Sequence, residues 1–289
     1  VEVRFKLDDK GFPIGINKKE MKDSNRLIEE FMLLANQHVA KSVGKVSKPQ
    51  TPKPFVYRIH DKPDPQKLEQ LGNYVAKFGY RIDKINGKNA AGAINKLMHA
   101  AKGQPEEDLI ATMAIRSMAK AVYSTHNIGH YGLAFDYYSH FTSPIRRYPD
   151  LEVHRLLSAY QHGKTFSNNY QLEEMCKHAS LNEKRATNAE RTSIKYKQVE
   201  YLSKRIGQVF DGIISSLTSW GIYVEILDGL CEGMISINSL KDDNYYFDDK
   251  EFVVKGGIHK HEYNMGDKVS IKVKSTDIYR RQIDFEMIE

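Results

Sequence analysis

The stretch Gly207-Gln-Val-Phe-Asp-Gly-Ile-Ile214 marks the point where the sequence changes character. From here to the C-terminus, apolar residues alternate with polar ones, and glycine and aspartate separate short runs. Alternation with a period of two is typical of β-strands that bury one face. Several such strands in so short a segment predict a small closed barrel over residues 205–289. The strands are expected at residues 209–214, 221–226, 233–237, 268–273 and 281–285.

Residues 1–204 carry a different, mostly helical pattern. Between Lys19 and Val43, apolar residues recur at spacings of three and four, and Ser24 is a candidate N-terminal cap. Alternation predicts two short strands within residues 1–16, and a short apolar-rich run predicts a third at residues 55–60. The chain is therefore expected to be a multidomain α+β protein, in which a mostly helical region precedes an all-β barrel. The helices are expected at residues 19–43, 65–78, 89–101, 106–123, 143–161 and 171–204.

The composition limits the class of protein. The 289-residue chain has ordinary apolar and charged fractions for a globular protein and a formal net charge of +6. A basic excess favours polyanionic partners, because phosphate contacts release counterions, but charge alone does not identify a nucleic-acid-binding protein. No window approaches the roughly 18 uninterrupted apolar residues that a membrane span needs, so no membrane partner is expected. The sequence leaves the oligomeric state open, and a monomer is the favoured assumption.

The cysteines and the first residues bear on the cellular setting. Cys176 and Cys231 lie far apart in the sequence, which excludes a disulfide framework and a cysteine-type zinc site and favours a reducing cytoplasm. The charged start from Val1 to Lys10 is not a secretory signal. Because this start also lacks an initiator Met, we expect that the chain begins inside a longer protein.

The barrel segment resembles an S1-type RNA-binding domain, which is one of the OB-folds. The resemblance implies a grip on single-stranded RNA, since such barrels display aromatic rings on which unpaired bases stack, each worth roughly 1–3 kcal/mol. Phe210, Trp220 and Tyr223 are the candidate RNA-binding rings, and core packing is the alternative for each of them. The matching segments are residues 207–214, 220–224, 232–236, 266–273 and 283–285.

Charged residues of the barrel segment suggest further contacts. Lys272 is a candidate phosphate contact, with a solvated surface position as the alternative. Residues 242–249 superficially look like a metal-binding cluster, but they lack the glycine and the terminal glutamate of a calcium loop. We therefore interpret them as a polar and aromatic loop of the barrel. Other basic candidates for phosphate contacts are Lys268, Lys274, Arg280 and Arg281.

The most informative stretch of the helical region is His140-Phe-Thr-Ser-Pro-Ile-Arg-Arg-Tyr-Pro-Asp-Leu-Glu-Val-His154-Arg155. Its Thr-Ser-Pro run, residues 142–144, is typical of a helix start, a hydroxyl cap followed by proline. A helix N-terminus favours a phosphate, and Arg146 and Arg147 would lie in the first turn. Arginine suits bidentate phosphate binding. From these residues alone, two exposed arginines beside a capped helix are the simpler alternative.

This stretch resembles the catalytic-domain signature of the ribonuclease II and ribonuclease R family, and it lies closest to the ribonuclease R branch. The resemblance implies a processive, hydrolytic 3′→5′ exoribonuclease that releases nucleoside 5′-monophosphates from single-stranded RNA. It also implies two divalent metal ions, usually Mg²⁺, that activate water and stabilise the leaving oxygen. Further motifs match in order at residues 26–36, 57–61 and 129–134.

The resemblance assigns roles to single residues. Arg146 corresponds to the family's essential active-site arginine, which holds the scissile phosphate and offsets charge in the transition state. Glu29 matches a glutamate at the ribose near the 3′ end, where a carboxylate accepts from the 2′-hydroxyl that DNA lacks. An ion pair on a helix surface is the alternative for Glu29. Arg147, Glu190 and Arg191 are further candidates for RNA binding, the latter two on a helix beside the RNA channel.

Three other residues of the matched motifs are expected to serve the structure. Asp150 would orient an arginine or cap the local fold. His60 and His154 are expected to be structural histidines with their hydrogen bonds satisfied, because a two-metal mechanism needs no histidine base.

The aspartate cluster that holds the family's metal ions has no match upstream of Glu29. We therefore expect the chain to be the C-terminal piece of a ribonuclease R-like enzyme, with the Mg²⁺ ligands before residue 1 and no nuclease activity of its own. Two other classes stay open. One is an RNA-binding module with no hydrolytic parent, and the other is a noncatalytic paralogue that acts as a scaffold.

Overall fold

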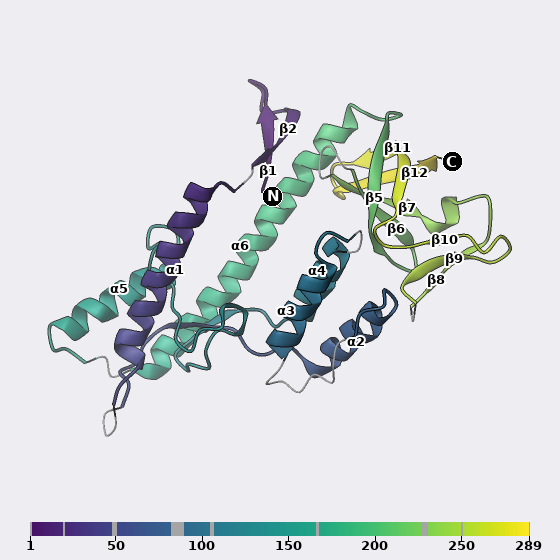
Figure 1. Cartoon of the computed structure of the whole chain (residues 1–289). Coiled ribbons are helices and arrows are strands. Elements are labelled where there is room, and N and C mark those ends of the chain that lie inside the picture. The colour runs from purple at the N-terminus through teal and green to yellow at the C-terminus, as the bar shows by residue number, and fades with distance from the viewer. Residues whose placement is uncertain are drawn as a thin grey trace. The chain divides into compact units, whose positions relative to one another are not determined.

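The computed structural model divides into two compact units. We call Met21–Thr187 the helical unit, and Val1–Glu20 together with Asn188–Glu289 the barrel unit. The long helix α6, Asn169–Ser203, runs from the first into the second (Figure 1). The residues that the structure describes are 2–19, 21–47, 51–81, 90–104, 107–165, 168–226, 231–249 and 251–288.

The helical unit combines helices with one small sheet, in which β3 (Tyr57–Ile59) pairs antiparallel with β4 (Val122–Ser124). A short 3₁₀ turn, η1 (Tyr131–Leu133), lies between β4 and the next helix. Among the described residues, no helix combines the length and apolar character needed to cross a membrane. The helices are α1 (Asp23–Gly44), α2 (Pro65–Ala76), α3 (Ala90–Ala101), α4 (Glu107–Ser117), α5 (Tyr148–Gln161) and the first part of α6.

One apolar core of this unit joins β3 and β4 to α1, α5 and α6. Phe55, Val153 and Cys176 are fully buried in it, and burying a large apolar side chain stabilises a fold by about 1.5–3 kcal/mol. Helix α1 enters this core only near its C-terminal end, where Ala40 and Val43 are buried. Its earlier turns expose apolar side chains, namely Leu27, Ile28, Phe31 and Leu34.

The barrel unit contains a closed barrel with the strand order β11-β12-β7-β6-β5. Along β6, Ile222, Val224 and Ile226 are buried, while the residues between them face outward. The predicted five-stranded barrel and its alternation are thus confirmed. The strands are β5 (Val209–Leu217), β6 (Gly221–Ile226), β7 (Glu232–Ser236), β11 (Lys268–Asp277) and β12 (Gln282–Ile288).

The first strands of the chain form a hairpin that belongs to the barrel unit. Strand β1 (Glu2–Leu7) pairs antiparallel with β2 (Pro13–Lys19). Helix α6 holds the turn between them, because Lys197 Nζ donates to the carbonyl of Gly11 at 2.7 Å. The ammonium of Lys204 also lies 3.6 Å from the centroid of the Phe12 ring, a cation–π distance.

A second sheet is inserted between β7 and β11. A 3₁₀ turn, η2 (Ile237–Ser239), leads to strands β8 (Tyr245–Asp248), β9 (Val253–Gly256) and β10 (Glu262–Tyr263). They form an antiparallel sheet in the order β10-β9-β8, which we call the insert sheet. The interpretation of residues 242–249 as a loop was therefore wrong in part, since β8 lies within them. Tyr245 and Phe247 of β8 pack against the barrel core, and Phe247 pairs with the fully buried Val254 of β9, which explains why these residues form a strand.

Three helix boundaries differ from the predictions by four residues or more. Helix α1 begins at Asp23, so Ser24 is not its cap, and the amide of Lys22 donates to Asn25 instead. Helix α4 ends at Ser117, because the following residues turn and then form β4 against β3. Helix α5 begins at Tyr148 and not at residue 143, so Arg146 and Arg147 precede the helix.

Candidate functional site

The segment from Tyr138 to Arg147 crosses the helical unit between β4 and α5, and we call it the arginine loop. Strand β3 fixes its beginning, since the amide of Arg58 donates to the carbonyl of Tyr138 at 2.9 Å. The buried hydroxyl of Ser139 donates to the carbonyl of Val56 at 2.6 Å. These bonds anchor the loop to the central sheet.

Helix α1 holds the middle of the arginine loop through one buried amide. The Oδ1 atom of Asn36 accepts from the amide of Phe141 at 2.9 Å, and its Nδ2 atom donates to the hydroxyl of Tyr138 at 3.2 Å. The ring of Phe141 stacks on His154 of α5 at 4.1 Å between centroids. Nε2 of the same histidine bonds the Phe141 carbonyl at 2.9 Å, which supports the structural role expected for His154.

A buried carboxylate fixes the end of the loop. Asp150 has no exposed surface, and its Oδ1 atom accepts from the amide of Ser143 at 2.8 Å and from the guanidinium of Arg147 at 2.7 Å. The carbonyl of Ser143 accepts from the amides of Arg146 and Arg147, so residues 144–146 form turns, and the helix starts later than the sequence signature indicated. Asp150 thus orients an arginine, the role expected for it. Arg147 serves the loop through this bond, which leaves its RNA-binding role a prediction.

Arg146 differs from its neighbour. Its side chain is exposed and has no hydrogen bond or ion pair with another described residue. Its backbone is nevertheless held, since the amide of Arg146 donates to the carbonyl of Ser143 at 3.3 Å. The guanidinium therefore projects from a fixed backbone with its donors unused by the described residues.

Neutral histidines and further cations surround the loop. Burial, followed by the fields of Arg147 and Arg58, lowers the pKa of His140 to about 2. Burial and His60 lower the pKa of His130 to about 4. Both rings are therefore uncharged near neutral pH, and the positive charge of the region resides on its arginines. Arg58 and Arg147 are paired with Glu183 and Asp150, so Arg146 is the cation of the loop that has no ion pair with another described residue and that would favour a bound anion.

His60 has a satisfied structural role, as expected. Its Nε2 atom bonds the carbonyl of Ala119 at 2.8 Å, and its Nδ1 atom accepts from the amide of Gly132 at 3.0 Å. Gly132 permits this approach, because a Cβ atom there would lie 2.8 Å from the same nitrogen. The ring thus ties β3 to the turn before the arginine loop.

Arg58, His140 and Asn36 belong to this site, but the sequence analysis did not single them out. Nη1 of Arg58 bonds Glu183 of α6 at 2.7 Å, and its guanidinium lies 4.6 Å from the centroid of the Tyr123 ring. The Tyr123 hydroxyl in turn bonds Nδ1 of His140 at 2.8 Å. All three residues lie inside the matched motifs. A polar residue inside such a motif was the signal that could have indicated their role in the site.

The structure brings the helix of Glu29 to the arginine loop, but it does not bring Glu29 into contact with Arg146. Glu29 is exposed and has no hydrogen bond or ion pair with another described residue. It lies on α1 seven positions before Asn36, which is two helical turns along the helix that braces the loop. The helix-surface ion pair considered for Glu29 is absent among the described residues.

Glu190 and Arg191 lie on α6 in the part that belongs to the barrel unit, whereas Arg146 belongs to the helical unit. Both are exposed. Their placement beside an RNA channel stays a prediction.

The barrel distinguishes among the aromatic candidates. Trp220 is 65% exposed on the turn between β5 and β6, so its ring is available for stacking. Phe210 is partly buried and packs against the barrel core, on the same side of β5 as Ile214, so core packing accounts for much of its surface. Tyr223 is partly exposed on the outward face of β6, where it pairs with Met234 of β7.

Lys272 lies on the outward face of β11 and is exposed. The register places it opposite Glu286 of β12 and Val209 of β5. This position is open to solvent, as a phosphate contact requires, but a solvated surface lysine would lie in the same way. Its role stays a prediction.

The expected metal centre needs a cluster of ligating side chains. No group of three or more His, Cys, Asp or Glu side chains among the described residues lies close enough to hold a metal ion. The described residues therefore do not supply ligands for the expected pair of Mg²⁺ ions, whose ligands were expected before residue 1.

Comparison with known proteins adds family evidence to this geometry. The RNB domain model matches residues 1–163, and the S1 RNA binding domain model matches residues 203–288. The predicted domain boundary near residue 204 stays a prediction, because these matches leave residues 164–202 unassigned and the compact units divide within α6.

Relatives match along the whole chain. Ribonuclease R 1 of Lactococcus lactis is 37% identical, and the alignment covers 100% of this chain and 35% of that protein. Ribonuclease R of Aquifex aeolicus is 36% identical, with 100% and 40% covered. The apo structure of Mycoplasma genitalium RNase R has a TM-score of 0.85 and 29% identity, with 99% and 45% covered. The complex of that protein with ribose-methylated single-stranded RNA gives the same values. The chain thus spans about two fifths of the length of these relatives.

Proposed function

Because the chain belongs to the RNB-domain family that includes ribonuclease R, we propose that it forms part of a processive, hydrolytic 3′→5′ exoribonuclease. The observation that carries this proposal is the arginine loop. Its backbone is braced by α1, β3 and α5, and it presents the unpaired guanidinium of Arg146. A fixed cation with free donors suits a phosphate whose negative charge grows during hydrolysis.

In this proposal Arg146 holds the scissile phosphate and offsets charge in the transition state. Bracing matters because a donor that is already in place needs no reorganisation at the moment of reaction. Asp150 and Asn36 are positioning residues, since they act on Arg146 only through the loop backbone. The products would be nucleoside 5′-monophosphates.

Glu29 supplies the choice of RNA over DNA in this proposal. Its carboxylate is exposed and unpaired among the described residues, so it is free to accept from a ribose 2′-hydroxyl. Helix α1 carries both this carboxylate and the amide that braces the arginine loop, so one rigid element would set the distance between sugar and phosphate contacts.

The barrel serves as a clamp for single-stranded RNA. Exposed Trp220 and outward-facing Tyr223 provide stacking surfaces, and Lys272 provides a phosphate contact. We extend the proposal to a cytoplasmic monomer, with both cysteines free and buried as a reducing compartment allows. The two Mg²⁺ ions would be held outside the described residues, because no suitable cluster lies within them.

A nuclease assay tests whether this chain binds RNA without cleaving it, as the proposal implies. We expect the purified 289-residue chain to bind single-stranded RNA but to leave it at full length when Mg²⁺ is added, because the described residues hold no metal cluster. A denaturing gel of labelled RNA gives the answer. Shortening of the RNA by the pure chain would overturn the proposal that its metal site lies elsewhere.

The full-length parent separates the enzyme from a noncatalytic scaffold or a pure RNA-binding module. Sequence upstream of this chain with closely spaced aspartates would favour the enzyme. Loss of turnover in an Arg146→Ala parent that still binds RNA would support the same reading. Loss of affinity alone, or no change, would favour one of the other classes.

A further inference from the structure

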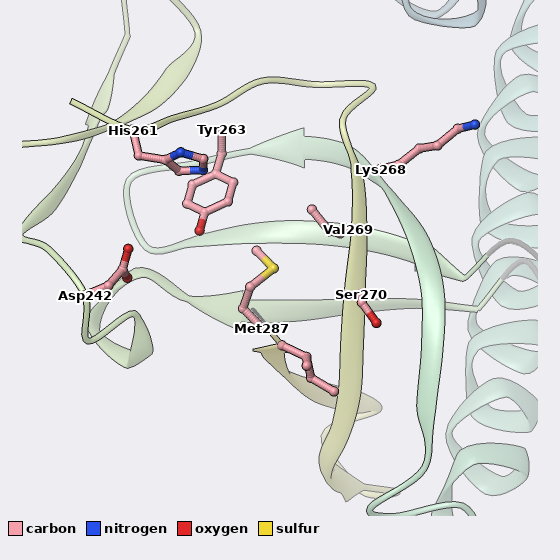
Figure 2. Close-up of a pocket in the computed structure, with 8 residues that line it drawn as sticks. Asp242, His261, Tyr263, Lys268, Val269, Ser270 and Met287 are labelled. Carbon is pink, nitrogen blue, oxygen red and sulfur yellow. The ribbon is translucent and has the colours of Figure 1, made fainter. Parts of the chain in front are cut away.

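A cavity of about 350 Å³ lies between the insert sheet and the barrel. Its volume falls within the range of pockets that take small ligands. Asp242, His261 and Tyr263 line it from the insert, and Val269 and Met287 line it from strands β11 and β12 (Figure 2). We call it the insert pocket.

The insert pocket has walls of two kinds. In Figure 2 the rings of His261 and Tyr263 lie on one side, and the apolar side chains of Val269 and Met287 lie below and beside them. The two rings meet edge to face at 4.6 Å between centroids. The opening between flat rings and a flexible thioether suits a flat aromatic ligand, because methionine adapts its shape to ring faces.

One carboxylate gives this pocket chemical selectivity. Oδ2 of Asp242 accepts from the hydroxyl of Tyr245 at 2.6 Å, which fixes the carboxyl group, and Oδ1 has no hydrogen bond to another described residue. Figure 2 shows the Asp242 carboxylate facing the same space as the Tyr263 hydroxyl. The Asp242 carboxylate therefore offers an acceptor to a ligand that carries N–H donors on the edge of a ring.

The wall that carries His261 is held in place from outside the pocket. Oδ2 of Asp243 accepts from the amides of Ile258 and His259 at 3.0 and 2.7 Å. The amide of Gly256 donates to the carbonyl of His261 at 2.8 Å. A Cβ atom at Gly256 would lie 2.5 Å from Asp243 Oδ2, so this close approach needs glycine.

The strand register places the insert pocket at the same end of the barrel as Trp220. Strand β11 begins beside the later half of β5, since the amide of Ile214 donates to the carbonyl of Asp267 at 2.9 Å. The turn with Trp220 follows β5, and its carbonyl accepts from the amide of Ile237, where the chain enters the insert. RNA stacked on Trp220 would thus meet the insert at this end of the barrel.

We propose that the insert pocket takes one unpaired base of the bound RNA and prefers guanine. Guanine presents two adjacent donors, N1–H and the 2-amino group, to a carboxylate, whereas adenine, cytosine and uracil each present one donor site. The base would lie against the rings of Tyr263 and His261. The proposal deepens the proposed role of the barrel in holding RNA and rests on it.

The charge of the barrel favours a nucleic acid over a basic peptide as the ligand. Lys268 lies at the rim of the pocket and extends away from the rings in Figure 2, and it has no ion pair with another described residue. This cation would repel a peptide of lysine and arginine residues and attract a phosphate backbone.

Base preference tests the proposal directly. Fluorescence anisotropy would compare the affinity of the 289-residue chain for oligouridine with that for the same oligomer carrying one guanosine, adenosine or cytidine. We expect the guanosine oligomer to bind about tenfold tighter than the others, the factor typical of one charge-assisted hydrogen bond. Equal affinity for all four oligomers would overturn the guanine pocket.

Substitutions of the lining residues test whether the guanosine preference arises in the insert pocket. We expect Asp242→Asn to abolish the guanosine preference while leaving the affinity for oligouridine unchanged, and His261→Ala to weaken it. The matched controls are Asp249→Asn and His259→Ala, which change the same residue types on the insert outside the pocket and should retain the preference. If the guanosine preference survives in Asp242→Asn, the preference arises outside the insert pocket and the proposal is overturned.

The outcomes separate this proposal from the function on which it rests. Oligouridine binding without a base preference would leave the RNA clamp intact and remove the guanine pocket. Absence of any RNA binding would remove both. Direct binding of a labelled arginine-rich peptide that is lost in Asp242→Asn, together with no base preference, would identify the pocket as a docking site for a protein and would also overturn the proposal.

Discussion

The arginine loop and the barrel's end at Trp220 present exposed side chains in opposite ways. Arg146 projects from a backbone held by the buried side chains of Asn36 on α1, Asp150 on α5 and Ser139 of the loop itself. Trp220 lies on a turn held by backbone bonds and the hydroxyl of Thr218. The first arrangement suits chemistry, which needs a donor in one position. The second suits a grip, which tolerates any base that stacks.

Removal of the buried Asp150 carboxylate should destabilise the arginine loop more than the other changes proposed below. In Asp150→Ala, the mostly buried Arg147 loses its ion partner and the Ser143 amide loses its acceptor. We expect the free energy of unfolding to fall by roughly 3–5 kcal/mol, as for other buried pairs that lose one member. Urea denaturation measures it.

Glu174→Gln is the control, since its ion pair with Lys177 is exposed on α6. This change should shift the free energy of unfolding by about 0.5 kcal/mol or less. A similar small shift for Asp150→Ala would show that the loop is not braced as described.

A fall in pH should destabilise the arginine loop before it destabilises the end of the barrel at Trp220. The folded-state pKa values of His140 and His130, about 2 and about 4, lie below the value of 6.5 for an unperturbed histidine. As the pH falls from 6.5 towards 4, the unfolded chain therefore binds protons that the folded chain excludes. The free energy of unfolding should decrease by up to about 1.4 kcal/mol per pH unit for each histidine.

The variant His140→Gln isolates this effect from the titration of carboxyl groups. Thermal or urea unfolding at a series of pH values should give a shallower decrease than in the unmodified chain between pH 6.5 and 4. An identical slope in both proteins would show that His140 is not held neutral by its surroundings.

Two aromatic substitutions sharpen the contrast within the barrel. Trp220→Ala should reduce the affinity for oligouridine about tenfold with little loss of stability, because the ring is 65% exposed and stacking is worth roughly 1–3 kcal/mol. Phe210→Ala should mainly lower stability, since its ring packs on the barrel core. The exposed Tyr246, on the insert sheet outside the insert pocket, provides the control Tyr246→Ala. The opposite assignment of the two effects would show that Phe210 is the stacking ring.

The smallest expected effect is on the stability of the arginine loop when Arg146 itself is changed. Arg146→Ala should alter the free energy of unfolding by no more than about 0.5 kcal/mol, because the side chain makes no bond to another described residue. A large loss would mean that this guanidinium supports the fold and is not reserved for a ligand. Urea denaturation beside Asp150→Ala makes the comparison within one loop.

The sequence predicted the elements whose pattern is local. The barrel strands follow from alternation, and the main helices follow from spacings of three and four. The start of α5 could not be predicted in this way, because the Asp150 carboxylate binds the Ser143 amide and the Arg147 guanidinium, and no local spacing indicates these bonds. Likewise, β4 forms because β3 lies beside it, and β8 forms because it pairs with β9 and packs Tyr245 and Phe247 against the barrel core.

The residues of the candidate site likewise divide into those that a local pattern predicts and those that it does not. Arg146 was identified from a motif, and its exposed position agrees with a role towards a ligand. The bond between Arg58 and Glu183 joins residues 125 positions apart, so no local pattern indicates it. Trp220 and Phe210 carried equal weight in the sequence, and only their different burial separates them.

The most direct test of the central claim is a single-turnover measurement on the full-length parent that carries Arg146→Lys. The change keeps the charge but removes the forked guanidinium, and removal of a preorganised donor costs about 10²–10³ in rate. We predict that the rate of RNA cleavage falls by that order, while the affinity for oligouridine stays within about threefold. An unchanged cleavage rate, or a loss of affinity as large as the loss of rate, would contradict the role assigned to the arginine loop.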